Sequence, residues 1–285
     1  MRRINAISLA ILAGLVCLAH AALAQNSAGT LEITARITPT AARPEPVRQF
    51  TFYILTKSYA DIAKEVEKGD VIPSRDEFID GLTVSKELKA WLKEHDTLDL
   101  TIPELDKMLS PDDIIHTPEF LLAYQHSNSG GVTNGIPKPK YREADKTAHP
   151  EKYNKAKQDY YTALKKFIQQ NPGTVSGVEL ELDAVNPQRK WALLQSNHKK
   201  RVEKMAPEVA QTKYLAGKVD TDLEGHGVIR GLAPGNYWIS SLNLDANAGD
   251  SHVRWDVPIT LQAGQTFRVE LTNLNAADTL AASVP

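Results

Sequence analysis

The chain has 285 residues, with 33 lysines and arginines against 35 aspartates and glutamates, giving a formal net charge of −2 at pH 7. This balance gives no electrostatic reason to expect a nucleic acid or an anionic membrane as partner. The one cysteine, Cys17, lies in the N-terminal leader, so the rest of the chain is expected to form no disulfide.

Residues 1–24 have the three parts of a secretory signal peptide. Arg2 and Arg3 supply the charged region, Ile7 to Ala19 form an apolar region, and Ala22-Leu23-Ala24 provides a small-residue cleavage site. The alternative, a retained membrane anchor, is disfavoured because the apolar region is short for a span. We therefore expect cleavage between Ala24 and Gln25, and a secreted or periplasmic protein. No other apolar run approaches about 18 residues, so no transmembrane segment is expected in the mature chain.

Two strands are expected next. Apolar residues alternate strictly with polar ones from Leu31 to Thr38, which is typical of a strand with one buried face. A proline-rich turn, Pro39 to Pro46, separates this segment from a second strand at 49–56.

The pattern then becomes helical over residues 58–207. Apolar spacing of three and four residues and N-terminal capping residues predict helices at 58–68, from Ser74, at 85–95, and from Thr101, Ser110 and Thr117. The clearest helix is expected at 150–170, and another from Pro187 to about Ala206. Residues 176–185 fit a strand or a helix, and we favour a helix. The segment 127–141 is expected to be a loop.

Strand patterns return at 214–219, 228–230, 236–244, 252–261 and 266–272. Pro234-Gly235 suits the centre of a type II turn, which would place Gly235 at a positive φ. Residues 274–285 are polar and alanine-rich, and we expect a disordered tail there.

The stretch 220–239, DTDLEGHGVIRGLAPGNYWI, resembles the T-D-x-x-G-x-(F/V)-x-x-x-x-L-x-P-G-x-Y signature of carboxypeptidase regulatory-like domains. The segment 255–271, WDVPITLQAGQTFRVEL, resembles the end of such a domain. The resemblance implies a transthyretin-like or Cna-B-like β-sandwich of the carbohydrate-binding-like folds. We therefore predict an α+β protein: a seven-stranded antiparallel sandwich (29–57 plus 208–273) with a helical insertion (58–207) between its second and third strands. The insertion resembles no family.

Several patterns that could carry chemistry have simpler explanations. Asp220, Asp222 and Glu224 imitate half of a calcium loop, but Gly231 stands where a bidentate glutamate is required. We expect an ordinary turn, with weak calcium binding left open. His226 and His252 lack a third histidine at ligand spacing, so no metal site and no cofactor are predicted.

Two further patterns suggest enzymes only weakly. Ser196 and Lys199 match S-x-x-K without its companion motifs, and Glu94-His95-Asp96 is better explained by a histidine at a helix end. No residue is therefore predicted to be catalytic.

The strand expected at 236–244 is apolar on both faces, with Tyr237 assigned to the core. Trp238, Leu242 and Leu244 would then share the outer face, where they require a cover or form a binding platform. These three are the candidate binding residues. We expect the helical insertion to cover them, and Trp255 to be buried in the core.

These features favour a secreted, non-catalytic binding or structural module of the cell envelope, acting on a protein or a surface. A carbohydrate-binding module, suggested by the fold group, is the main alternative. An enzyme with its site in the helical insertion is a third.

Overall fold

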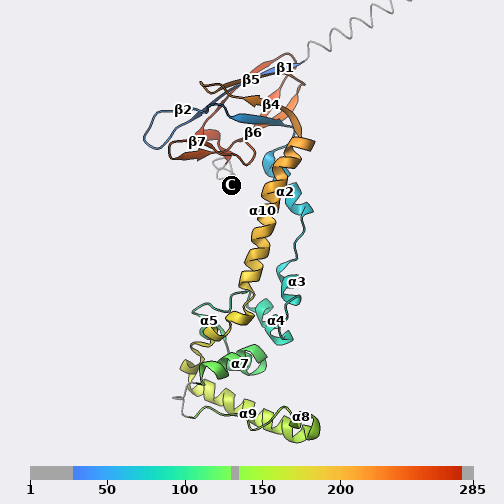
Figure 1. The fold of residues 1–285 in the computed structure, drawn as a ribbon, viewed down its shortest axis with the longest axis vertical. Coiled ribbons are helices and arrows are strands. Elements are labelled where there is room, and N and C mark those ends of the chain that lie inside the picture. Colours follow the sequence, from blue (N-terminus) through green and yellow to red (C-terminus); the bar gives the residue numbers. More distant parts are fainter. Residues whose placement is uncertain (1–27, 130–134, 278–285) are drawn as a thin grey trace, which may run out of the picture. The chain divides into compact units, whose positions relative to one another are not determined.

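The computed structural model describes residues 28–129 and 135–277 (Figure 1). Helices make up 46% and strands 22%, and most strands pair in antiparallel fashion, which confirms the mixed α+β class. The expected signal peptide, its cleavage site and residues 278–285 of the expected tail lie outside the described residues. Labels of helices and strands follow Figure 1.

Contacts divide the chain into two compact units. Unit 1 consists of Met1–Val71 and Lys199–Pro285, and unit 2 of Ile72–His198. The strands all belong to unit 1. The first helix, α2 (Tyr59–Gly69), and the second half of α10 (Gln188–Lys213) also belong to unit 1, although the sequence placed 58–207 in one insertion.

The first sheet of unit 1 is built around β1 (Gly29–Ile37). This strand pairs in parallel with β10 (Thr266–Leu271), and antiparallel with β5 (His226–Leu232) and with the short β2 (Glu45–Pro46). The parallel pair departs from the purely antiparallel arrangement that the sequence suggested.

The second sheet is antiparallel, in the order β4-β3-β6-β9, and β7 pairs with β8 separately. These strands are β3 (Thr51–Leu55), β4 (Leu215–Asp220), β6 (Gly235–Ser240), β7 (Ala246–Ala248), β8 (Ser251–Val253) and β9 (Asp256–Leu261). The described residues thus form ten strands in three sheets rather than seven in two. The expected strand 252–261 is interrupted at Arg254-Trp255, and β2 and β7 are too short to give a periodic signal.

Both four-stranded sheets contribute to one buried core. The alternating residues of β1 are buried as expected, and Phe52 packs edge-on against Trp255 with ring centroids 5.6 Å apart. The indole N–H of Trp255 donates to the carbonyl of Thr272, at 2.9 Å. The prediction that Trp255 is a core residue is confirmed. The packed chain continues past residue 273, since Ala276 is also buried in this core.

Two predictions about β6 and the turn that precedes it are wrong. Strand β6 ends at Ser240, because Leu242 has a φ of 55° and the chain turns there. Gly235 does not adopt a positive φ, whereas Gly225 (81°) and Gly231 (83°) do. A Cβ on Gly225 would lie 2.5 Å from the carbonyl oxygen of Ala35, so that position has no room for a side chain.

Unit 2 is helical. Its helices are α3 (Arg75–Asp80), α4 (Lys86–Glu94), α5 (Leu105–Met108), α6 (Pro111–His116), α7 (Pro118–Ser127), α8 (Asp145–Ala148), α9 (Pro150–Gln170) and the first half of α10. Ser74 caps α3 with the expected capping box through Glu77. Residues 172–185 form three short 3₁₀ turns, Pro172–Val175, Val178–Glu181 and Asp183–Val185, rather than the expected helix.

A second core holds unit 2 together. It joins α4, α6, α7 and α9, with Trp91 packed edge-on against Phe120 at 5.0 Å. Helix α10 continues through Pro207, where the sequence suggested its end, and buries Ala210 in unit 1. Within the described residues, none of the helices has the length and apolar character required to span a membrane.

Candidate functional site

The outer face of β6, where the sequence suggested a binding platform, carries a small apolar cluster. Leu242 is 4% exposed and packs with Leu55, Ile62 and Ala210, and Trp238 lies partly buried against them. The cover comes from α2 and the end of α10. Leu244 lies beyond the turn and is 48% exposed. The three predicted residues therefore do not form one platform.

A partly buried carboxylate fixes the start of α2 on this sheet. Asp256, on β9, accepts the backbone N–H groups of Tyr59 and Ala60, at 3.0 and 3.1 Å. A carboxylate at a helix N-terminus satisfies free donors and interacts favourably with the helix dipole. Burial nevertheless raises the pKa of Asp256, and the two backbone hydrogen bonds oppose that shift. This contact serves the packing of α2.

Glu65, on α2, is the centre of a polar network that we call the Glu65 cluster. Its carboxylate accepts from Lys213 (2.6 Å), from Tyr214 (2.7 Å) and from Lys57. The ammonium groups of Lys57 and Lys213 also lie 5.3 and 4.9 Å from the Tyr214 ring centroid. These hydrogen bonds, that of Lys213 foremost, lower the pKa of Glu65 to about 2. The cluster joins α2 to the end of α10.

The acidic turn between β4 and β5 binds its own backbone. Asp222 accepts the N–H groups of Glu224 and His226, at 3.0 and 2.8 Å, and Asp220 accepts the hydroxyl of Thr51. Short acidic side chains commonly stabilise turns in this way. The side chains of Asp220 and Asp222 are thus engaged within unit 1.

The remaining candidates from the sequence are dispersed. His226 contacts Thr34, and His252 contacts Asn247, so the two histidines have different neighbours. His95 stacks on Trp91 at the end of α4. Ser196 and Lys199 are both exposed on α10. Across residues 28–129 and 135–277, no three histidine, cysteine or acidic side chains gather as metal ligands.

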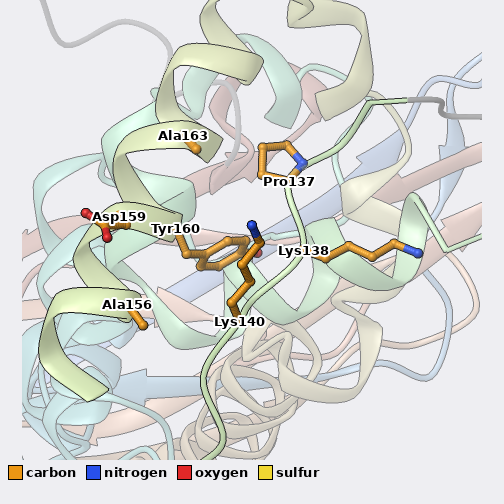
Figure 2. Close-up of a pocket in the computed structure, with 7 residues that line it drawn as sticks. All are labelled: Pro137, Lys138, Lys140, Ala156, Asp159, Tyr160 and Ala163. Carbon is orange, nitrogen blue, oxygen red and sulfur yellow. The ribbon is translucent and has the colours of Figure 1, made fainter. Parts of the chain in front are cut away.

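Unit 2 contains a groove that the sequence did not reveal. Figure 2 shows it between α9 and the segment 137–140. Ala156, Tyr160 and Ala163 line it from α9, at spacings of four and three residues on one helical face. Pro137, Lys138 and Lys140 line the opposite side, and the hollow has a volume of about 350 Å³. Asp159 lies at its margin and points away from Pro137 (Figure 2).

A second hollow, of about 550 Å³, adjoins the first and shares Pro137, Lys138 and Tyr160 with it. Its other lining residues come from the end of α7 and the segment after it: Tyr124, Gln125, Asn128, Ser129, Gly135, Ile136 and Pro139. We call the two hollows together the Tyr160 groove. Six of the ten residues lining the second hollow have a hydrogen-bonding group in the side chain.

Tyr160 is the central residue of this groove. Its side chain is 5% exposed, and its hydroxyl oxygen accepts from the amide of Gln125, at 2.9 Å. Within the described residues no acceptor takes the hydrogen of that hydroxyl. Burial raises the pKa of Tyr160, so the phenol stays protonated at neutral pH and can donate. The adjacent Tyr124 differs, because its hydroxyl is bonded to that of Thr174, at 2.9 Å.

A cluster of tyrosines supports the groove from α9. The ring of Tyr141 lies 5.2 Å from that of Tyr153 and 6.0 Å from that of Tyr160, both edge-on. Tyr153 donates to Glu143, which raises the pKa of Tyr153 to about 12. Lys157 lies 6.0 and 5.4 Å from the ring centroids of Tyr153 and Tyr161. We call these four tyrosines the tyrosine cluster. It holds the segment that follows Lys140 against α9.

The lysines of the groove have no carboxylate partner in the described part of the chain. Lys138 and Lys140 are exposed and take part in no ion pair there. Helical spacing places Ala156 and Tyr160 on one face of the helix expected at 150–170, and this spacing does not distinguish a groove from a core. One signal was available: residues 138–166 contain nine lysines and arginines but only four aspartates and glutamates.

No family model matches the chain, and neither the curated proteins nor the solved structures with which it was compared include a match. The resemblance of 220–271 to the carboxypeptidase regulatory-like domains thus rests on the sequence motif alone.

Proposed function

We propose that the protein is a non-catalytic binding module of the cell envelope, exported by its N-terminal leader, that attaches to a surface or a protein through the Tyr160 groove. In this proposal the strands of unit 1 form a sandwich of the carboxypeptidase regulatory-like class, interrupted between its second and third predicted strands. Unit 2 supplies the binding site.

The observation that carries the proposal is that some groups lining the Tyr160 groove lack a hydrogen-bond acceptor or an ion-pair partner among the described residues. Its buried phenol retains a hydrogen to donate, and its two lysines have no carboxylate partner among the described residues. In unit 1, by contrast, the acidic and basic side chains nearest the expected platform bind one another or the backbone. Groups that remain available in a concave site favour ligand binding over a purely structural role.

The lining also favours binding over catalysis. Tyrosine, glutamine and lysine side chains provide donors and cations, while the lining carboxylate, Asp159, points away from the opposite wall (Figure 2). Nucleophilic catalysis requires a nucleophile next to a general base. The tyrosine, glutamine and lysine groups of the lining suit binding of a ligand without turnover.

A carbohydrate platform at Trp238 is the second candidate, because a hollow of about 340 Å³ adjoins that residue. Trp238 pairs with Pro258 across β6 and β9, and Thr260 donates to Asn236, at 2.8 Å, in the same hollow. An aromatic face beside polar side chains is a common arrangement for sugar binding.

The experiment is co-sedimentation of the exported protein with insoluble cell-envelope material. The variant Ala156→Met/Ala163→Met fills the groove with residues that favour helix. We expect it to reduce the bound fraction at least tenfold. Ala192→Met, at an exposed site on α10 in the same unit, is the matched control and should bind normally.

Thr260→Tyr tests the second candidate by narrowing the hollow beside Trp238. Loss of binding in Thr260→Tyr, with normal binding in Ala156→Met/Ala163→Met, would place the site on unit 1. Equal binding by all variants and the parent protein would contradict both candidate sites.

A further inference from the structure

Basic residues outnumber acidic ones in the segment that supplies Lys138, Lys140 and the α9 wall of the Tyr160 groove. Nine basic side chains lie between Lys138 and Lys166, and of these only Lys165 forms an ion pair within the described residues, with Asp112. Four acidic residues lie in the same segment. Residues 72–129, by contrast, contain five basic and twelve acidic side chains. Segment 138–166 therefore carries a net positive charge in a chain whose total charge is slightly negative.

The lining of the groove is suited to a ligand rich in hydroxyl groups. Tyr160 offers a hydroxyl hydrogen, and the Gln125 amide uses one of its donors on that phenol, leaving its carbonyl oxygen as an acceptor. Both side chains line the second hollow. A sugar hydroxyl is a donor and an acceptor at once, so one sugar ring can engage both groups.

The same lining is poorly suited to an acidic peptide. Peptides bind through a strand edge or through apolar pockets that hold alternate side chains. Among the described residues, Ile136 is the one large aliphatic residue that lines either hollow, and the α9 wall presents two alanines. Pro137 and Pro139 lack the backbone N–H groups that strand pairing requires.

The two hollows form one elongated site because they share Pro137, Lys138 and Tyr160. The site extends from Ala163 on α9 to Asn128 after α7, with Lys138 in both hollows and Lys140 in the first. We infer that the Tyr160 groove binds a segment of an anionic polysaccharide, whose hydroxyl groups contact Tyr160 and Gln125 and whose charged groups contact Lys138 and Lys140. This inference rests on the proposed function and adds the class of ligand.

The test measures the affinity of the exported protein for an oligogalacturonate and for its fully methyl-esterified form, which has the same sugars without the charge. We expect the charged form to bind at least tenfold more tightly, and the difference to shrink as salt rises. A phosphodiester-linked oligosaccharide forms a separate arm, which tells whether carboxylate or phosphate is the preferred anion.

Two pairs of variants connect the binding to the groove. Lys138→Gln/Lys140→Gln should weaken binding of the charged form about tenfold, whereas Lys107→Gln/Lys190→Gln removes the same charge from exposed positions elsewhere in unit 2 and should not. Tyr160→Phe should weaken binding of both forms several-fold, whereas Tyr161→Phe should not. Circular dichroism should give the same melting midpoint for the two lysine double variants.

The outcomes separate the inference from the proposed function. Loss of envelope binding in Ala156→Met/Ala163→Met, without binding of any anionic oligosaccharide, would overturn the inference and leave the proposed function standing. Equal binding of the charged and esterified forms, or an equal loss in both lysine double variants, would overturn the role of Lys138 and Lys140. Binding of polyglutamate as tight as that of the oligosaccharide would overturn the choice of a saccharide in favour of an acidic peptide.

Discussion

Each unit contains a group of tyrosines and lysines, and the two groups differ in how the lysine charges are neutralised. In the Glu65 cluster of unit 1, Lys57 and Lys213 lie over the ring of Tyr214 and both bind Glu65. In the tyrosine cluster of unit 2, Lys157 lies over two rings and has no carboxylate partner among the described residues. The same residue types thus form a charge-balanced network in unit 1, whereas in unit 2 the lysine contacts the tyrosine rings without a carboxylate among the described residues.

The largest expected effect separates the two units by deletion. A short Gly/Ser linker from Val71 to Lys199 removes unit 2 but retains α2 and the end of α10, and the Asp70–Arg201 ion pair, at 2.8 Å, shows that these ends lie close together. We expect a soluble monomer with one cooperative thermal transition.

The matched deletion joins residues 57 and 208 and removes α2 as well. Leu55 and Leu242 then lose their packing contact with Ile62. The loss of buried apolar surface on these three side chains should lower the free energy of unfolding by about 5 kcal/mol. We expect aggregation and binding of a hydrophobic dye. A sharp transition equal to that of the longer variant would show that the Glu65 cluster and the apolar cover are dispensable.

The next effect tests how closely the backbone of unit 1 packs around Gly225. Gly225→Ala should lower the free energy of unfolding by about 3 kcal/mol or more, because a positive φ is combined with a clash against the backbone of Ala35. Gly231→Ala, at nearly the same φ but with open space around it, should cost about 1 kcal/mol. Chemical denaturation of both variants measures the difference. Equal losses would mean that the packing around Gly225 relaxes freely.

The smallest effect concerns acid stability. The pKa of Glu65 is lowered to about 2 in the folded protein from 4.5, so its carboxylate stabilises the fold above pH 4.5 and loses this contribution as the pH falls towards 2. Glu65→Gln should therefore be less stable than the parent at pH 7, and the gap should close between pH 4.5 and 2. Thermal melts across that range measure it. A gap independent of pH would show that the charge of Glu65 contributes nothing.

Most strands of unit 1 could be predicted from the sequence, because alternation of apolar and polar residues indicates a strand with one buried face. Leu31 to Ile37 are an example: the same residues that alternate in the sequence alternate in burial. The end of β6 was not accessible, since the apolar pattern continues through Leu244 while the backbone turns at Leu242. Backbone geometry at a non-glycine residue leaves little trace in residue type.

The Tyr160 groove could not be predicted for a different reason. Helical periodicity places Ala156 and Tyr160 on the inner face of α9, but it does not tell whether the facing segment fills that face or leaves a hollow. That outcome depends on where segment 137–140 lies, and the segment carries no periodic pattern. The local excess of basic residues indicated the region without indicating the site.

The pairing of β1 has a consequence for how the chain is made. About 230 residues separate Ile37, at the end of β1, from Thr266, at the start of its parallel neighbour β10. At 5–20 residues per second, synthesis leaves β1 without that neighbour for roughly 10 to 50 s. Until then one edge of β1 has no partner for its backbone hydrogen bonds. The order of the strands thus delays completion of the first sheet, because β1 can pair with β10 only after β10 has been synthesised.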